Sequence, residues 1–214
     1  MQSEPFLLIG MLDSPFVRRV AIALEIYGLP YENLPLRTLA DAATFATFSP
    51  LRRAPTLRLP SGELLFDSHM ILAYLDELVP EEKRLWPQKP EARLLARQVV
   101  AAAAGIGDKA VQGVYERVFH SPPSRNTLWL ARIRDQLRDA ATWLNQRAPA
   151  HDFLFGEEPS HADIVVGTAL RFVSEAHPDT VELGALPSLR LWIERLERLE
   201  VFKKTYLELD PPEA

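Results

Sequence analysis

The chain has 214 residues, of which 47% are hydrophobic and 25% charged, and its net charge at pH 7 is −5. These values are typical of a globular protein and exclude a disordered chain or a coiled coil. The sequence contains no cysteine, which excludes disulfides, thiolate metal sites and a protein thiol nucleophile. The longest apolar run, Val99 to Gly107, is about half as long as a membrane span needs. The sequence has neither a basic patch nor an N-terminal signal pattern. We therefore expect a cytoplasmic protein with neither nucleic acid nor membrane as a partner.

The first eighty residues predict alternating strands and helices. The apolar run 6–9, which ends at Gly10, is typical of a buried strand. Residues 15–27 repeat apolar side chains at helical spacing, and Arg18 and Arg19 occupy the opposite, polar face. The other elements expected here are strands at 31–36, 56–59 and 64–66 and helices at 41–48 and 68–78. The predicted order is βαβαββα, with a hairpin between the last two strands.

The composition changes at residue 80. Prolines frame an acidic stretch at 80–89, which predicts a linker between one domain at 1–79 and another at 90–214. Beyond it only helical periodicity is found, with helices expected at 91–119, 125–147, 162–175, 186–199 and near 202–207. The sequence therefore predicts a small α/β domain followed by a larger all-α domain.

The loop between the first strand and the first helix reads MLDSPFVRRV at 11–20. It resembles the serine-type active-site stretch of bacterial cytosolic glutathione transferases, in which the serine hydroxyl points at the glutathione sulfur. The resemblance implies that Ser14 stabilises the thiolate and that Phe16 belongs to the glutathione site. A hydroxyl donor at the positive end of a helix favours the thiolate, which is the reactive form of a thiol. Alternatively, Ser14 only caps the helix, with Pro15 in its first turn; the two roles are compatible.

A second stretch, SPLRRAP at 49–55, precedes the third strand. It is similar to the family's N-P-x-G-K-V-P run, whose last proline is cis. The match implies that Pro55 is cis, that the backbone of Ala54 pairs with the cysteinyl part of glutathione, and that Arg53 binds the glycyl carboxylate. The alternative is a proline-rich turn with a solvated arginine pair.

Two residues in this stretch depart from the family pattern. Ser49 stands in place of asparagine, and Arg52 stands in place of a glycine, which leaves the loop conformation open. These departures are the features that favour a non-catalytic binding or regulatory module on the same fold.

The third stretch, DSHMI at 67–71, lies where the fourth strand meets the next helix. It matches the family's E/D-S-x-x-I sequence, which holds the γ-glutamyl group. The match implies that Ser68 and the backbone amides at the helix start bind the carboxylate, and that Asp67 binds the ammonium group. Alternatively, the pair is an ordinary Asp-Ser helix cap.

Other sequence features indicate structure instead of chemistry. Ser160 and Asp163 have the spacing of a capping box that opens a hydrophobic helix. The five histidines lack metal-ligand spacing, so we expect no metal and place these residues at surface or cap positions.

With these three stretches in order, the chain resembles the glutathione S-transferase family, and the resemblance extends over essentially its whole length. The resemblance implies a thioredoxin-like domain and an all-helical domain, with glutathione as co-substrate, a small hydrophobic electrophile as second substrate, and a homodimer. A glutathione-dependent peroxidase, dehalogenase or isomerase is an alternative on the same fold. An apolar pocket for the second substrate is expected between the domains, with candidate walls Met11, Leu12, Phe16, Tyr115, Phe119, Phe202 and Tyr206.

Overall fold

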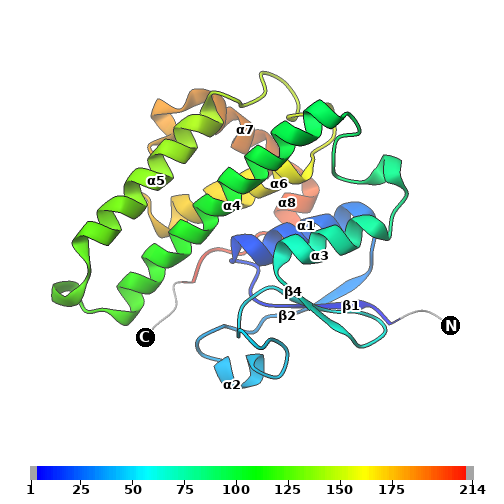
Figure 1. The fold of residues 1–214 in the computed structure, drawn as a ribbon, viewed down its shortest axis with the longest axis horizontal. Coiled ribbons are helices and arrows are strands. Elements are labelled where there is room, and N and C mark those ends of the chain that lie inside the picture. Colours follow the sequence, from blue (N-terminus) through cyan, green and yellow to red (C-terminus); the bar gives the residue numbers. More distant parts are fainter. Residues whose placement is uncertain (1–3, 211–214) are drawn as a thin grey trace. The chain divides into compact units, whose positions relative to one another are not determined.

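The computed structural model describes residues 4–210 and divides into two compact units (Figure 1). The first, called here the sheet unit, comprises the chain up to Leu85 together with Val201–Leu207. The second, the helical unit, comprises Trp86–Glu200 and the described residues from Glu208 onward. The sequence predicts that the last residues continue the helical domain, whereas the structure groups residues 201–207 with the sheet.

A four-stranded mixed sheet forms the centre of the sheet unit, with strand order β2-β1-β3-β4. Its strands are β1 (Phe6–Ile9), β2 (Tyr31–Leu34), β3 (Thr56–Arg58) and β4 (Leu64–Phe66). β1 pairs with β2 in parallel and with β3 antiparallel, and β3 and β4 form the predicted hairpin. Leu8 and Ile9 of the inner strand β1 are fully buried, which accounts for the uninterrupted apolar run in the sequence.

Helices cover this sheet on both faces. Figure 1 shows α1 (Pro15–Tyr27) and α3 (Ser68–Glu77) side by side on one face, with the short α2 (Ala42–Phe45) on the other. The Tyr27 hydroxyl in α1 donates to the Asp76 carboxylate in α3 and accepts the Leu85 amide at 2.9 Å. Burial, and then Asp76, raise the pKa of Tyr27 far above its ordinary value, so this phenol remains a donor.

The face of α1 that the sequence marks as polar is buried, so that prediction was wrong. Arg18 is 3% exposed and Arg19 is 1% exposed. α8 (Glu200–Lys204) supplies the cover for Arg18, and the first residue of α3 accepts a hydrogen bond from Arg19. Both guanidinium groups therefore serve long-range contacts that helical spacing does not reveal.

The helical unit is built around α6. Its main helices are α4 (Pro90–Phe119), α5 (Thr127–Asn145), α6 (His161–Ala176) and α7 (Pro187–Glu197), and α4 packs against α5 and α6. The predicted capping box is present: the Asp163 carboxylate accepts the Ser160 amide at 2.9 Å and the Ser160 hydroxyl at 2.6 Å. It also accepts the Trp192 indole N–H at 2.9 Å, so the start of α6 and the middle of α7 share one buried acceptor.

Among residues 4–210, three 3-10 helices that the sequence pattern does not predict interrupt the connections: Glu81–Lys83, Pro122–Ser124 and Leu183–Ala185. The first falls inside the expected linker. None of the helices among residues 4–210 combines the length and apolarity that crossing a membrane requires.

Candidate functional site

The strand register brings the three sequence stretches to one edge of the sheet. Ile9, the last residue of β1, pairs with Thr56, the first residue of β3, and Thr56 pairs in turn with Phe66, the last residue of β4. The loop after β1, the loop before β3 and the loop after β4 therefore emerge together. Loops that are separate in the sequence become neighbours because β3 runs antiparallel to both partners.

Ser14 is the N-cap of α1, and its hydroxyl oxygen accepts the Val17 amide at 3.5 Å. Its carbonyl accepts the amide of Arg18 at 2.9 Å, which is the first hydrogen bond of the helix. The side chain is half-buried. Because the oxygen is the acceptor in the cap, the hydroxyl proton is still available to an anion at the helix N-terminus. The cap and the expected donor role are thus compatible in geometry.

The Ala54-Pro55 peptide bond is cis, as the resemblance implies. Pro55 is buried and Ala54 is half-buried, whereas Arg53 is exposed. Arg52 has a φ of 50°, so this arginine keeps the left-handed conformation of the glycine expected at its position. Ser49 is 1% exposed, and its hydroxyl oxygen accepts a hydrogen bond from the Arg53 amide at 3.4 Å. The two departures from the family pattern are therefore accommodated without loss of the turn.

The third stretch starts α3. Asp67 has a φ of 70°, and its carboxylate accepts the amides of His69 at 2.8 Å and Met70 at 3.3 Å. Ser68 is 3% exposed, and its hydroxyl accepts a hydrogen bond from the Arg19 guanidinium. Asp67 is thus a helix cap, which was the alternative interpretation, and its position at an exposed helix start also suits a ligand ammonium group.

Two further residues, which lie outside the three sequence stretches, position these loops. Gly10 has a φ of 133°, and a Cβ there would lie 2.9 Å from the Cβ of Ala54. The Asn33 amide in β2 donates to the carbonyls of Leu8 at 2.9 Å and Gly10 at 3.0 Å. The only sequence signals are a glycine after a strand and a polar residue within one.

Five of the expected pocket walls lie in the sheet unit. Met11, Leu12 and Phe16 are partly exposed, and Tyr206 is 38% exposed. Phe202 has no exposed surface, and the Arg18 guanidinium carbon lies 5.4 Å from its ring centroid. The expectation that Phe202 lines a pocket was therefore wrong, because a ring with no exposed surface lines no open pocket.

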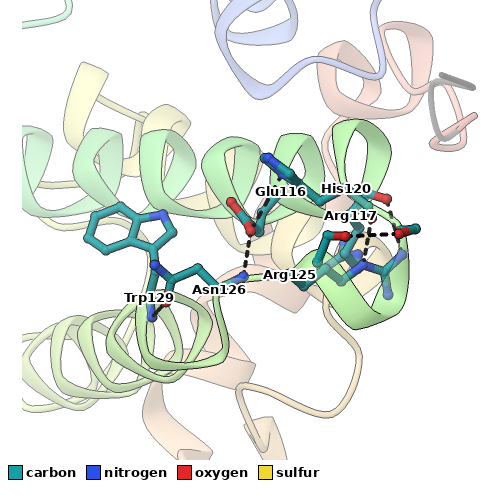
Figure 2. A network of polar contacts seen from close by, with 8 residues as sticks. Glu116, Arg117, His120, Arg125, Asn126 and Trp129 are labelled. Carbon is teal, nitrogen blue, oxygen red and sulfur yellow. Dashed lines mark hydrogen bonds and ion pairs between the residues drawn. The ribbon is translucent and has the colours of Figure 1, made fainter.

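The other two expected walls, Tyr115 and Phe119, belong to the last turns of α4 in the helical unit. Their ring centroids are 5.8 Å apart, and Phe119 is 58% exposed. Figure 2 shows the network around this corner, in which Glu116 accepts the Asn126 amide at 2.8 Å and Arg125 donates to the Arg117 carbonyl at 3.1 Å. These bonds fix the end of α4 against the start of α5.

Histidines contribute to packing in this structure. The expected surface or cap position was wrong for His161, which is 4% exposed and is the first residue of α6. It holds for His177, which is the C-cap of α6 and is 8% exposed. Among residues 4–210, no three histidine, aspartate or glutamate side chains come close enough together to hold a metal ion.

A thioredoxin-like sheet domain carrying a cis-proline loop, followed by an all-helical domain, defines the class of protein. The glutathione S-transferase N-terminal domain model matches residues 8–83, and the C-terminal domain model matches residues 128–195. The chain belongs to the glutathione S-transferase family.

Three relatives illustrate the similarity. A glutathione S-transferase of Methylobacterium radiotolerans, solved in complex with glutathione sulfonate, is 28% identical with a TM-score of 0.89, covering 99% of each chain. Glutathione S-transferase U6 of Arabidopsis thaliana is 25% identical over 205 residues, which span 94% of this chain and 88% of that protein. Mouse maleylacetoacetate isomerase is 27% identical over 217 residues, which span 99% of this chain and 96% of that enzyme.

Proposed function

We propose that this chain is a glutathione transferase, which binds glutathione where the three loops meet and activates its thiol for attack on a small hydrophobic electrophile. The observation that carries the proposal is the register of β1, β3 and β4, which gathers the Ser14, Ala54-Pro55 and Asp67-Ser68 loops at one edge. The glutathione sulfonate bound by the Methylobacterium relative supports the choice of ligand.

Ser14 is assigned to the thiolate. A free thiol has a pKa of about 8.5, so most of it is protonated at neutral pH. The hydroxyl proton of Ser14, together with the positive end of the thirteen-residue helix α1, stabilises a sulfur anion placed at the cap. Each unit by which the thiol pKa falls corresponds to about 1.4 kcal/mol of preference for the thiolate.

The remaining residues hold the peptide. The exposed Arg53 supplies a cation for the glycyl carboxylate, and the backbone of Ala54 pairs with the cysteinyl group. At the γ-glutamyl end, the Ser68 hydroxyl and the positive end of α3 suit the carboxylate. Asp67, whose carboxylate accepts the His69 and Met70 amides, suits the ammonium group. Phe16, whose ring lies 5.6 Å from the Arg19 guanidinium carbon, lines the same site.

The proposal includes a homodimer. Exposed apolar side chains lie on β4 and α3, where Phe66 is 39% and Met70 56% exposed. Leu51, in the loop before β3, is 69% exposed. A second copy of the chain would cover these side chains, and sedimentation equilibrium measures the mass directly.

Calorimetric titration with glutathione tests the binding step, and the absorbance of the bound thiolate, followed against pH, tests the activation step. We expect binding at sub-millimolar to millimolar concentration and a thiol pKa below the free value. Binding with an unshifted thiol pKa would support the non-catalytic module instead. Absence of both heat and thermal stabilisation at millimolar glutathione would reject the proposal.

Glutathione-dependent isomerisation is a second candidate, favoured by the similarity to mouse maleylacetoacetate isomerase over nearly the whole chain. The two reactions differ in their stoichiometry. Conjugation consumes one free thiol for each product molecule, whereas isomerisation returns the thiol. Free-thiol titration during turnover of model electrophiles, and of maleylacetoacetate, distinguishes them; formation of glutathione disulfide with peroxides would indicate a peroxidase.

A further inference from the structure

Arg18 connects two parts of the chain that are far apart in sequence. It lies in α1, four residues after Ser14, and its Nη2 donates to the Phe202 carbonyl at 2.9 Å. Its guanidinium carbon lies 5.4 Å from the ring centroid of Phe202 and 5.4 Å from that of Tyr206. Arg18 is 3% exposed. Two aromatic rings and a carbonyl acceptor stabilise a guanidinium that is buried in this way.

A second contact joins the same segment to the other end of α1. Lys204 lies 2.7 Å from the Glu25 carboxylate as an ion pair. Val201–Leu207, which we call the terminal strap, is part of the sheet unit, and Figure 1 shows α8 beside α1. The strap is itself ordered locally, since the hydroxyl of Thr205 donates to the Val201 carbonyl at 2.7 Å. It therefore holds α1 at two places.

Arg18 is also hydrogen-bonded to Ser14, the residue assigned to the thiolate. The Arg18 backbone amide donates to the Ser14 carbonyl at 2.9 Å, and its side chain donates to the strap. A single residue thus joins the first turn of α1 to Phe202 through two consecutive hydrogen bonds. Donors that stabilise an anion are effective when their positions are fixed before the ligand arrives.

We propose that Arg18 is a positioning residue, which, by holding the terminal strap against α1, keeps the Ser14 hydroxyl and the helix N-terminus where they stabilise the glutathione thiolate. This role rests on the proposed function. Arg18 itself does not touch the reacting atoms, because its guanidinium is enclosed by the strap.

The experiment compares Arg18→Met, which keeps the aliphatic stem without the cation, with Arg18→Lys, which keeps a cation and donor. Arg58→Met is the matched control, since Arg58 is an exposed arginine of β3 in the same unit. Three quantities are measured on the full chain: the pKa of the bound thiol, the glutathione Kd, and hydrogen exchange of the 201–207 amides.

For Arg18→Met we expect faster exchange at 201–207, a thiol pKa higher by about one unit, about tenfold lower kcat below that pKa, and a Kd within about threefold of the wild type. Arg18→Lys should recover part of the thiol shift, and Arg58→Met should match the wild type. Faster exchange at 201–207 with an unchanged thiol pKa would overturn the proposal, because Arg18 would then be purely structural. Unchanged exchange at 201–207 in Arg18→Met would also overturn it. If the wild-type protein does not lower the pKa of the bound thiol, the proposed function itself is rejected. The pKa of the thiol bound to the wild type is therefore measured before any variant is compared.

Discussion

Gly10 and Val17 approach each other so closely that a Cβ at Gly10 would lie 2.7 Å from the Cγ2 of Val17. The same Cβ would lie 2.9 Å from the Cβ of Ala54, next to the cis-proline. Gly10 also has a φ of 133°, which side-chain-bearing residues rarely adopt. Absence of a side chain at this position therefore sets the spacing between the Ser14 loop and the Ala54-Pro55 loop.

Gly10→Ala should lower the free energy of unfolding by about 2 kcal/mol or more, since backbone strain and overpacking add. Gly62→Ala is the matched control: Gly62 has a φ of 100°, but nothing lies within 4 Å of its Cβ position. Urea unfolding measures both. Equal losses in the two variants would mean that the close approach to Val17 and Ala54 has no energetic weight.

Two substitutions of Ser14 separate its cap from its proposed donor role. Alanine is a poor N-cap and costs about 1 kcal/mol of stability, whereas glycine costs only a few tenths. Neither has a hydroxyl. We expect both Ser14→Gly and Ser14→Ala to raise the pKa of the bound thiol equally, while only Ser14→Ala is clearly destabilised in thermal unfolding. A normal thiol titration in Ser14→Gly would show that Ser14 is only a cap.

Adjacent arginines provide a paired test of carboxylate recognition. Arg52 and Arg53 are both exposed, and only Arg53 is assigned to glutathione. An exposed ion pair contributes up to about 1 kcal/mol, so Arg53→Ala should weaken glutathione binding about fivefold. Arg52→Ala should bind as the wild type does. Calorimetry at low and high salt checks the assignment, because the difference between the two variants should shrink as salt screens the charge; identical affinities at low salt would contradict it.

His177 makes the helical unit sensitive to acid. Its Nδ1 lies 2.9 Å from Arg117 Nη1, and its Nε2 lies 2.8 Å from the Ala110 carbonyl. Because a guanidinium only donates, Nδ1 is the acceptor, and the proton resides on Nε2. Burial lowers the pKa of His177, and the charge of Arg117 lowers it further, against the opposing effect of the Ala110 carbonyl.

The unfolded chain therefore binds a proton at His177 at a higher pH than the folded chain does. From this residue the free energy of unfolding is constant above about pH 6.5 and falls by up to about 1.4 kcal/mol per pH unit below it, until the folded pKa is reached. Urea unfolding at several pH values should show a smaller acid-dependent loss in His177→Gln than in the wild type. His120→Gln is the control, since His120 is exposed; parallel pH profiles for wild type and His177→Gln would refute the assignment.

Much of the candidate site could be predicted because its signals are local. The Ser14 cap and the Ser160–Asp163 capping box each depend on residues within a few positions of one another. The cis Ala54-Pro55 bond was expected from the resemblance of the 49–55 stretch to the family's run. Local signals also located the predicted strands and helices. These elements differ from the prediction mainly at their ends, where fraying and capping decide the boundary.

The errors share a different physical origin. Arg18 and Arg19 look like surface residues because helical spacing places them opposite the apolar face, yet their partners are Phe202 and Ser68. His177 is buried because Gly113 leaves room for its ring, with a Cβ there only 2.7 Å from Cε1. A polar residue is buried when a distant segment supplies both cover and a hydrogen-bond partner. Composition and periodicity carry no information about such a segment.

The terminal strap also determines when the sheet unit can finish folding during synthesis of the chain. Arg18 and Phe202 are separated by 184 positions. The sheet unit, whose strands are synthesised first, therefore lacks its last segment until the ribosome has translated residues 201–207. Until then α1 carries a guanidinium without its carbonyl acceptor or aromatic cover. Translation that stops before Val201 would leave the sheet unit without this segment, so synthesis of residues 201–207 is a condition for completing the packing of that unit.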